Sequence, residues 1–198
     1  MSPTEARPLR ADAQRNRDRL LEVAVRAFSH DGPDVTLESI AGEAGVGIGT
    51  LYRHFPTREA LIEAAYRSEL ARLCAGVPDL LETLPADVAL RTWMDRFIDY
   101  LATKRGMADA LRMVIASGGN PHAQSRESLL EAIGSLVKAG ADEGQLRSDV
   151  DPTDVMLGIS GVSLVAGTPD QRDQAGRLLD LLLDGLRYRP PGSDAAAS

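Results

Sequence analysis

The side chains that most often perform catalysis or bind metals are few in this sequence and do not cluster. The three histidines, His30, His54 and His122, are far apart and show no metal-ligand spacing. Ser135 and Lys138 match the S-x-x-K spacing of serine acyltransferases, but neither companion motif, K-T-G or S-D-N, occurs, so we assign both to a helix surface. We therefore predict no catalytic residue, no metal site and no cofactor.

Residues 36–55 group polar side chains on one short predicted helix. The glycines of this segment do not match the nucleotide-binding pattern G-x-G-x-x-G, because no strand precedes them and Thr stands where the third glycine belongs. Leu51 and Phe55 are four residues apart, so both anchor a helix over 48–55 on an apolar core. The remaining positions then lie on its other sides: Ile48, Gly49, Thr50, Tyr52, Arg53 and His54. Hydroxyl, imidazole and guanidinium groups are usual partners of phosphate.

Capping and turn residues mark the helix ends around this segment. Thr36 is placed to cap a helix over 37–44, and Gly45 can take the left-handed conformation that ends it. Val46 fills the angle between the two helices, and Thr57 caps the helix that follows. The pattern predicts a helix-turn-helix.

Helical apolar spacing continues along the rest of the chain. Aromatic residues are only 4% of 198, and Ala and Leu are abundant, which favours closely packed helices over sheets. We predict an all-α fold of about nine helices, at 11–30, 37–44, 48–55, 57–75, 86–104, 107–117, 121–142, 152–166 and 170–188. Asn120, Asp151 and Thr168 each precede a proline and are the predicted N-caps of the last three.

The helices divide into a small N-terminal and a larger C-terminal group. We predict an N-terminal domain over 1–70, which holds the helix-turn-helix at about 36–55, and a C-terminal domain over 71–189. The tail 190–198 has too few apolar side chains to pack and is predicted to be disordered.

Charge and cysteine content narrow the class of protein. The net charge is −7, yet residues 1–19 carry five arginines and three acids, whereas residues 69–198 carry 13 basic and 19 acidic side chains. Phosphate contact depends on the local electric field, so this distribution of charge does not exclude a nucleic-acid partner.

Cys74 is the only cysteine, which excludes an intramolecular disulfide. No uncharged run approaches the ~18 residues of a membrane span. We expect a cytoplasmic protein without a membrane partner.

The sequence TLESIAGEAGVGIGTLYRHFPTREALIEAAY, residues 36–66, closely resembles the DNA-binding signature of the tetracycline-repressor (TetR) family. The resemblance implies a homodimeric regulator of transcription that binds double-stranded operator DNA. Repression relieved by a small-molecule effector is the default expectation for such a protein.

The resemblance also assigns roles to single residues. It implies phosphate contacts for Thr36, Tyr52, His54 and Arg58. It implies an approach to base edges in the major groove for Ile48, Gly49 and Thr50. The recognition helix of the family often opens with Ser and then Lys, where this chain has Gly47 and Ile48. Gly47 gives up a side-chain cap, and Ile48 offers an apolar group suited to a thymine methyl, so we expect Ile48 to read a T.

The stretches RFIDYLATKRGMADALR and GQLRSDVDP resemble an SbtR-like subgroup of the TetR ligand domains. The resemblance implies an effector pocket in this region, and pockets favour aromatic and Met side chains with a few polar groups. The predicted lining residues are Trp93, Phe97, Tyr100, Met107, Met113, His122, Met156 and Ser160. Core packing is the alternative for most of them.

The last predicted helix carries more leucines than one side of a surface helix can bury: Leu178, Leu179, Leu181, Leu182, Leu183 and Leu186. The helix before it contains small residues, including Gly158 and Gly161, that permit close helix approach. A homodimer through the last two helices would cover the excess, and the resemblance implies the same interface.

Two alternatives stay open. The first is a helical sensing module whose DNA-binding part has lost operator affinity. The second, which ranks behind it, is a helical enzyme. The arginines at 15, 17 and 19 fit phosphate contact and a solvated helix face equally well. Salt-sensitive, sequence-specific DNA binding would favour the regulator, and turnover of a ligand would favour the enzyme.

Overall fold

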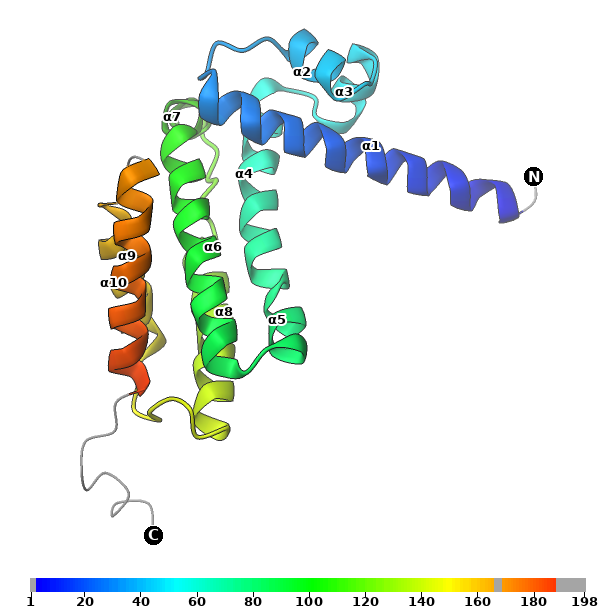
Figure 1. Cartoon of the computed structure of the whole chain (residues 1–198). Coiled ribbons are helices and arrows are strands. Elements are labelled where there is room, and N and C mark those ends of the chain that lie inside the picture. The colour runs from blue at the N-terminus through cyan, green and yellow to red at the C-terminus, as the bar shows by residue number, and fades with distance from the viewer. Residues whose placement is uncertain (1–2, 166–168, 188–198) are drawn as a thin grey trace. The chain divides into compact units, whose positions relative to one another are not determined.

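The computed structural model describes residues 3–165 and 169–187. Ten helices lie within these ranges (Figure 1): α1 Pro3–His30, α2 Leu37–Glu43, α3 Ile48–His54, α4 Arg58–Ala75, α5 Val77–Thr83, α6 Ala86–Gly106, α7 Ala108–Ala116, α8 Ser125–Asp142, α9 Pro152–Ser163 and α10 Pro169–Arg187. The prediction of an all-α fold with about nine helices is confirmed. The additional helix is α5, which lies between the predicted helices 57–75 and 86–104.

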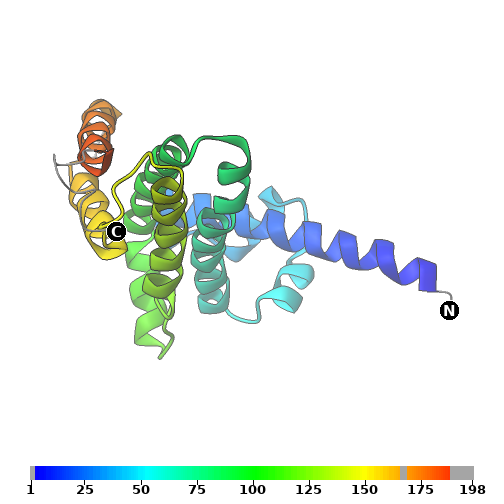
Figure 2. The same cartoon turned by 90° about the horizontal axis from the view of Figure 1, so that it is seen from below.

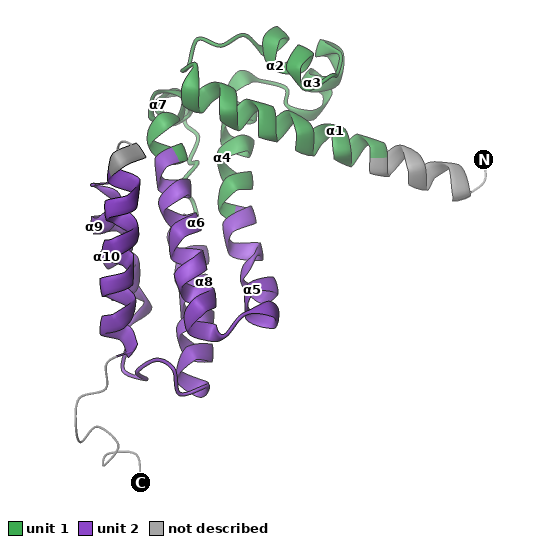
Figure 3. Cartoon of the chain, viewed as in Figure 1, with its two compact units in different colours: residues 1–70, 103–123 green, residues 71–102, 124–198 purple. Residues whose placement is uncertain are grey.

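The chain forms two compact units (Figure 3). Unit 1 comprises residues 1–70 and 103–123, and unit 2 comprises residues 71–102 and 124–198. Helices α4 and α6 each contribute residues to both units. The predicted functional division into 1–70 and 71–189 stays a prediction, because these units are defined by packing alone.

The core of unit 1 is built around the apolar face of α1. Leu20, Ala24 and Phe28 recur four residues apart and are fully buried, and Ile40 of α2 and Leu51 of α3 are buried with them. Helix α3 lies beside α2 in Figure 1, and both pack on α1. This packing fixes the two short helices, which could not be stable in isolation at seven residues each.

The core of unit 2 is formed by one face of α6 together with the last three helices. Trp93 and Phe97 are at most 1% exposed, and the indole Nε1 of Trp93 donates to the Leu73 carbonyl oxygen at 3.2 Å. Helices α9 and α10 lie side by side in both views (Figures 1 and 2). Several ion pairs join α10 to α6, among them Arg172 to Asp95 at 2.9 Å, Arg172 to Asp99 at 3.3 Å and Arg91 to Asp180 at 2.6 Å.

Several predicted helix ends are corrected by the structure. Helix α1 begins at Pro3 rather than at residue 11, and α8 begins at Ser125 rather than at residue 121. The predicted N-cap Asn120 is therefore wrong: its carbonyl oxygen accepts a hydrogen bond from Arg67 at 3.2 Å, within a turn that precedes α8. Gln124, at φ 64°, is in the left-handed region and separates that turn from the helix.

The other two predicted proline-associated caps have different outcomes. The Asp151 cap is confirmed, since its carboxylate accepts from the Thr153 backbone N–H at 2.7 Å. The cap predicted at Thr168 and the tail predicted at 190–198 lie outside the described residues. Across the described ranges, no helix combines the length and the apolar character needed to cross a membrane.

Candidate nucleic-acid interface

The turn between α2 and α3 has the geometry that its residues predict. The Thr36 side-chain oxygen accepts a hydrogen bond from the Ser39 backbone N–H at 3.1 Å and so caps α2. Gly45 lies at φ 68°, a left-handed conformation that other residue types adopt at a cost. The Val46 backbone N–H then donates to the Ala41 carbonyl oxygen at 3.0 Å, which closes the end of α2 and sets the direction of α3.

Helix α3 is held from one side and exposed on the other. Leu51 is fully buried and Phe55 is 3% exposed, so both anchor the helix on the core of unit 1. Ile48 is 36% exposed and Tyr52 is 46% exposed. The exposed positions of this segment are Gly47, Ile48, Gly49, Tyr52 and Arg53, while Thr50 and His54 are half-buried. We call these seven residues the α3 face.

Arg58 has internal partners that the sequence did not reveal. Its guanidinium carbon lies 5.1 Å from the centroid of the Phe28 ring, and its Nη2 donates to the Pro33 carbonyl oxygen. The side chain therefore ties the first turn of α4 to the end of α1 and to the loop after it. A phosphate contact by Arg58 stays a prediction, and the structure adds a structural role.

Arg53 lies on the exposed side of α3, as its spacing from Leu51 and Phe55 predicts, and its side chain contacts the first turn of the helix. Its Nη2 donates to Thr50 Oγ1 at 2.8 Å, and its Nε donates to the Gly49 carbonyl oxygen at 3.3 Å. The available signal was its spacing, since residues three and four positions apart are neighbours on a helix. Arg53 thus belongs to the same surface as Gly49 and Thr50, two of the three residues predicted to approach bases.

The arginines of α1 differ from one another. Arg15 forms an ion pair with Asp12 on the same helix. The Arg17 guanidinium carbon lies 5.6 Å from the centroid of the Phe55 ring, and Arg19 Nη1 donates to the Ala44 carbonyl oxygen at 3.5 Å. Arg17 and Arg19 thus contact α3 and the end of α2, which brings positive charge to the helix-turn-helix.

The residues predicted to line an effector pocket fall in both units. Trp93, Phe97 and Tyr100 stack in succession along α6, with ring centroids 5.2 Å and 6.0 Å apart, and are at most 5% exposed. Met156 is buried, and its carbonyl oxygen accepts from the half-buried Ser160 hydroxyl at 2.7 Å. These five residues belong to unit 2.

The remaining three predicted pocket residues belong to unit 1. Met107 is fully buried, and Met113 is 39% exposed on α7. His122 Nδ1 lies 3.2 Å from the Tyr66 hydroxyl oxygen, and the two rings meet edge to face at 5.2 Å between centroids. This pair joins the turn before α8 to α4.

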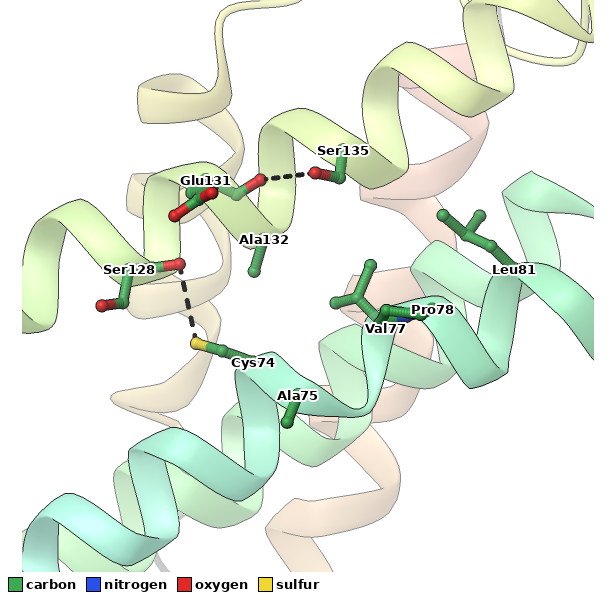
Figure 4. A pocket seen from close by; sticks show the side chains of 9 residues that line it. All are labelled: Cys74, Ala75, Val77, Pro78, Leu81, Ser128, Glu131, Ala132 and Ser135. Atoms are coloured by element: carbon green, nitrogen blue, oxygen red, sulfur yellow. Dashed lines mark hydrogen bonds between the residues drawn. The ribbon is translucent and has the colours of Figure 1, made fainter.

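A groove of about 500 Å³ lies within unit 2 (Figure 4). Its lining side chains come from the end of α4, from α5 and from α8: Cys74, Ala75, Val77, Pro78, Leu81, Ser128, Glu131, Ala132 and Ser135. The Cys74 thiol donates to the Ser128 carbonyl oxygen at 3.6 Å, and burial raises the pKa of this thiol, with a further contribution from the Glu131 carboxylate. None of the eight predicted pocket residues lines this groove.

A second cavity, of about 210 Å³, lies between the loop before α9 and the end of α10; its lining includes Arg147, Asp149 and Leu186. Arg147 pairs with Asp149 at 2.6 Å, which lowers the pKa of that carboxyl. In the described part of the chain, no group of three or more His, Cys, Asp or Glu side chains is arranged to hold a metal ion.

Taken together, a capped α2, a left-handed glycine turn and a short α3 with an exposed polar face define a helix-turn-helix protein of the DNA-binding class. Residues 20–65 match the sequence profile of the bacterial regulatory proteins of the tetR family, and residues 85–188 match that of the C-terminal domain of SbtR-like transcriptional regulators. The chain belongs to the TetR family of DNA-binding transcriptional regulators. The resemblance expected from residues 36–66 is confirmed.

Solved structures and curated relatives support this assignment. A TetR transcriptional regulator from Streptomyces coelicolor is 58% identical, with a TM-score of 0.84 over 88% of this chain and 99% of that one. A TetR transcription regulatory protein from Mycobacterium vanbaalenii is 33% identical, with a TM-score of 0.76 over 91% and 100%. An HTH-type transcriptional regulator of Staphylococcus aureus is 29% identical over 113 residues, which are 57% of this chain and span only 60% of that relative.

Proposed function

We propose that this chain is a cytoplasmic repressor that binds a palindromic operator as a homodimer and is released from it by a small-molecule effector. The α3 face carries the proposal. Leu51 and Phe55 hold this short helix rigidly from behind, while Tyr52 and Arg53 are exposed. A fixed helix that presents hydrogen-bonding side chains outward suits insertion into the major groove.

The roles of single residues follow from their positions around α3. We propose that Thr36, Tyr52, His54 and Arg58 position the protein on phosphates, and that Gly47, Ile48, Gly49 and Thr50 lie against the base edges. The Thr36 hydroxyl accepts from Ser39, so its own hydrogen remains for an oxygen acceptor such as phosphate. The open space around Gly47 and Gly49 supports a close approach by DNA. Apart from the adjacent residues and the backbone of α3 itself, nothing in the described chain would lie within 4 Å of a Cβ at either position.

The homodimer is proposed to form through α9 and α10. Leu157 on α9 is 60% exposed, Leu164 just after that helix is 82% exposed, and Leu181 on α10 is 68% exposed. Exposed large apolar side chains on two adjacent helices support an interface, because a second copy would remove them from water. A two-fold dimer would present two α3 helices to half-sites about 34–36 Å apart.

The effector is proposed to bind in the C-terminal part. It would act because its affinity for the DNA-binding state of the protein differs from its affinity for the released state. The predicted pocket residues Trp93, Phe97 and Tyr100 are closely stacked and buried, so a ligand among them would have to displace the stack. The groove beside Cys74 is already open in this structure. Helix α4 supplies residues to both units and offers a continuous path for a conformational change.

A reporter experiment tests the direction of regulation. A duplex that the protein selects from a random-sequence pool is placed between a promoter and a reporter gene in a bacterium that lacks this chain. Co-expression of the wild type should lower reporter output, because a dimer bound between the promoter and the gene obstructs the transcribing polymerase. Tyr52→Ala should restore most of the output. Raised output would identify an activator and contradict repression.

A further inference from the structure

Arg53 lies on the α3 face with its guanidinium directed back along the helix. The hydrogen bonds of its Nε to the Gly49 carbonyl oxygen and of its Nη2 to Thr50 Oγ1 measure 3.3 Å and 2.8 Å. Long helical side chains lean toward the N-terminus of their helix, so these two residues are the expected neighbours. The two hydrogen bonds hold the guanidinium over the first turn of α3, beside the residues proposed to lie against bases.

The charge of Arg53 is uncompensated within the described residues, where no carboxylate lies within 4.0 Å of its nitrogen atoms. Two other arginines of unit 1 differ in this respect: Arg26 pairs with Glu43 at 2.7 Å, and Arg67 pairs with Glu63 at 2.7 Å. A guanidinium has five N–H donors, and the internal contacts of Arg53 occupy Nε and one hydrogen of Nη2. The hydrogens of Nη1 and the second hydrogen of Nη2 form a fork that fits two neighbouring acceptors.

We propose that Arg53 reads a guanine in the major groove through paired hydrogen bonds to O6 and N7, with Thr50 and Gly49 positioning its guanidinium. This inference rests on the proposed function, because it requires α3 to enter the major groove. Guanine presents two adjacent acceptors at that edge, whereas adenine pairs its N7 acceptor with a donor and thymine offers one acceptor beside a methyl group. A phosphate could accept the same fork, but the position over the first turn of α3 favours a base.

The Thr50 hydroxyl acquires a defined role from the same contact. Because its oxygen accepts from Arg53, its own hydrogen is left for an acceptor outside the helix. Thr50 therefore acts on recognition in two ways, by positioning Arg53 and by donating a hydrogen bond. Thr50→Ser keeps the hydroxyl, and Thr50→Val keeps the shape of the side chain without it.

The test starts from duplexes that the wild type selects from a pool with randomised base pairs. Affinities are then measured by fluorescence anisotropy for the selected duplex, for duplexes with each guanine changed to adenine, and for duplexes with 7-deazaguanine, which lacks the N7 acceptor. The variants are Arg53→Ala and Arg53→Lys, which keeps the charge and loses the fork. Arg112→Ala is the matched control, because Arg112 is 71% exposed on α7 and pairs with Asp109 of the same helix.

At one guanine in each half-site, the change to adenine should weaken wild-type binding roughly tenfold to hundredfold, and 7-deazaguanine should weaken it as well. Arg53→Ala should bind the original and changed duplexes almost equally, and Arg112→Ala should behave as the wild type. Arg53→Lys should keep only part of the discrimination, because an ammonium can donate to O6 and N7 but lacks the planar fork. Thr50→Val should lose part of the discrimination at that same guanine, and Thr50→Ser should keep it.

Three results would overturn this role. Arg53→Ala could weaken all duplexes equally and reduce the salt dependence, which would identify a phosphate contact. Second, Arg53→Ala could leave both the selected motif and the affinity unchanged. Third, the selected motif could lack a guanine that responds to substitution of Arg53. If the wild type selected no motif at all, the proposed sequence-specific regulator would fail, and the role of Arg53 would fall with it.

Discussion

The guanidinium of Arg58 lies 5.1 Å from the centre of the Phe28 ring and donates to the Pro33 carbonyl oxygen, which links α4 to α1 and to the loop after it. Removal of this side chain should therefore affect stability as well as DNA binding. We expect Arg58→Ala to lower the free energy of unfolding by about 2 kcal/mol, from the loss of a cation–π contact and of a charged hydrogen bond. Urea unfolding measures this, with Arg112→Ala as a control that should change little.

The effect of Arg58→Ala on stability can be separated from its effect on DNA binding by a suitable choice of temperature. At a temperature where the variant is fully folded by circular dichroism, a phosphate contact predicts weaker binding to selected and scrambled duplexes alike. Wild-type affinity for both duplexes under these conditions would show that Arg58 acts only on the fold. A changed sequence preference would contradict the phosphate role.

Ile48 provides a test of apolar base reading. Its side chain is 36% exposed on α3, so it is accessible to a partner. If it packs on a thymine methyl, Ile48→Ala should reduce the preference for T over uracil, which lacks the methyl, by about 1 kcal/mol at one position. Anisotropy titrations with single T-to-U duplexes measure this preference. Equal wild-type and variant preferences at every T would rule out the contact.

His122 should make the stability of the protein depend on pH. Partial burial of its ring, together with the positive charge of Lys104, lowers the pKa of the largely exposed His122 below its ordinary value of 6.5. As the pH falls through the region just below 6.5, the unfolded chain binds more protons than the folded chain, so the free energy of unfolding decreases. His122→Gln should remove this part of the dependence.

The measurement is urea unfolding at pH 7.5 and at pH 5.5, at one protein concentration. Between these two conditions, the midpoint of the wild type should fall further than that of His122→Gln. Tyr66→Phe, which removes the hydroxyl 3.2 Å from His122 Nδ1, should leave the His122-dependent fall in place, because burial is the main cause of the lowered pKa. An equal fall in the wild type and His122→Gln would contradict the assignment.

The proposed dimer interface predicts a position-specific effect of a new charge. Leu181→Glu places a carboxylate on α10 at a side chain that is 68% exposed in the single chain. Burial of this charge against a second copy would be unfavourable, so the dimer should dissociate at least about tenfold more readily. Analytical ultracentrifugation measures the dissociation constant. Ile115→Glu, at a 51% exposed apolar position on α7, should leave it unchanged; a Leu181→Glu dimer as strong as the wild type would place the interface elsewhere.

The helix-turn-helix was predictable because its signals are local. A cap such as Thr36 satisfies an N–H group only three residues away, and Gly45 is favoured by a backbone angle of its own residue. The apolar spacing of Leu51 and Phe55 indicated correctly which side of α3 is buried. These features depend on residues within one or two helical turns.

The errors arose where distant residues decide the structure. The sequence around Asn120 resembles a capped helix start, but its carbonyl oxygen is bound by Arg67, which is 53 residues away. The internal partners of Arg58 are 25 and 30 residues away in the chain and leave no periodic signal. The contacts of Arg53 were within reach of spacing rules, because Thr50 and Gly49 lie three and four positions before it on the same helix.

The proposed function requires that the α3 face recognise a specific DNA sequence. The most direct test compares wild-type affinity for a selected duplex with affinity for a scrambled duplex of the same composition, at 50 and 200 mM salt. We predict that the selected duplex binds about 10³-fold or more tightly, that added salt weakens both, and that Thr50→Val loses much of the difference. Equal wild-type affinity for the two duplexes would contradict sequence-specific recognition by the α3 face.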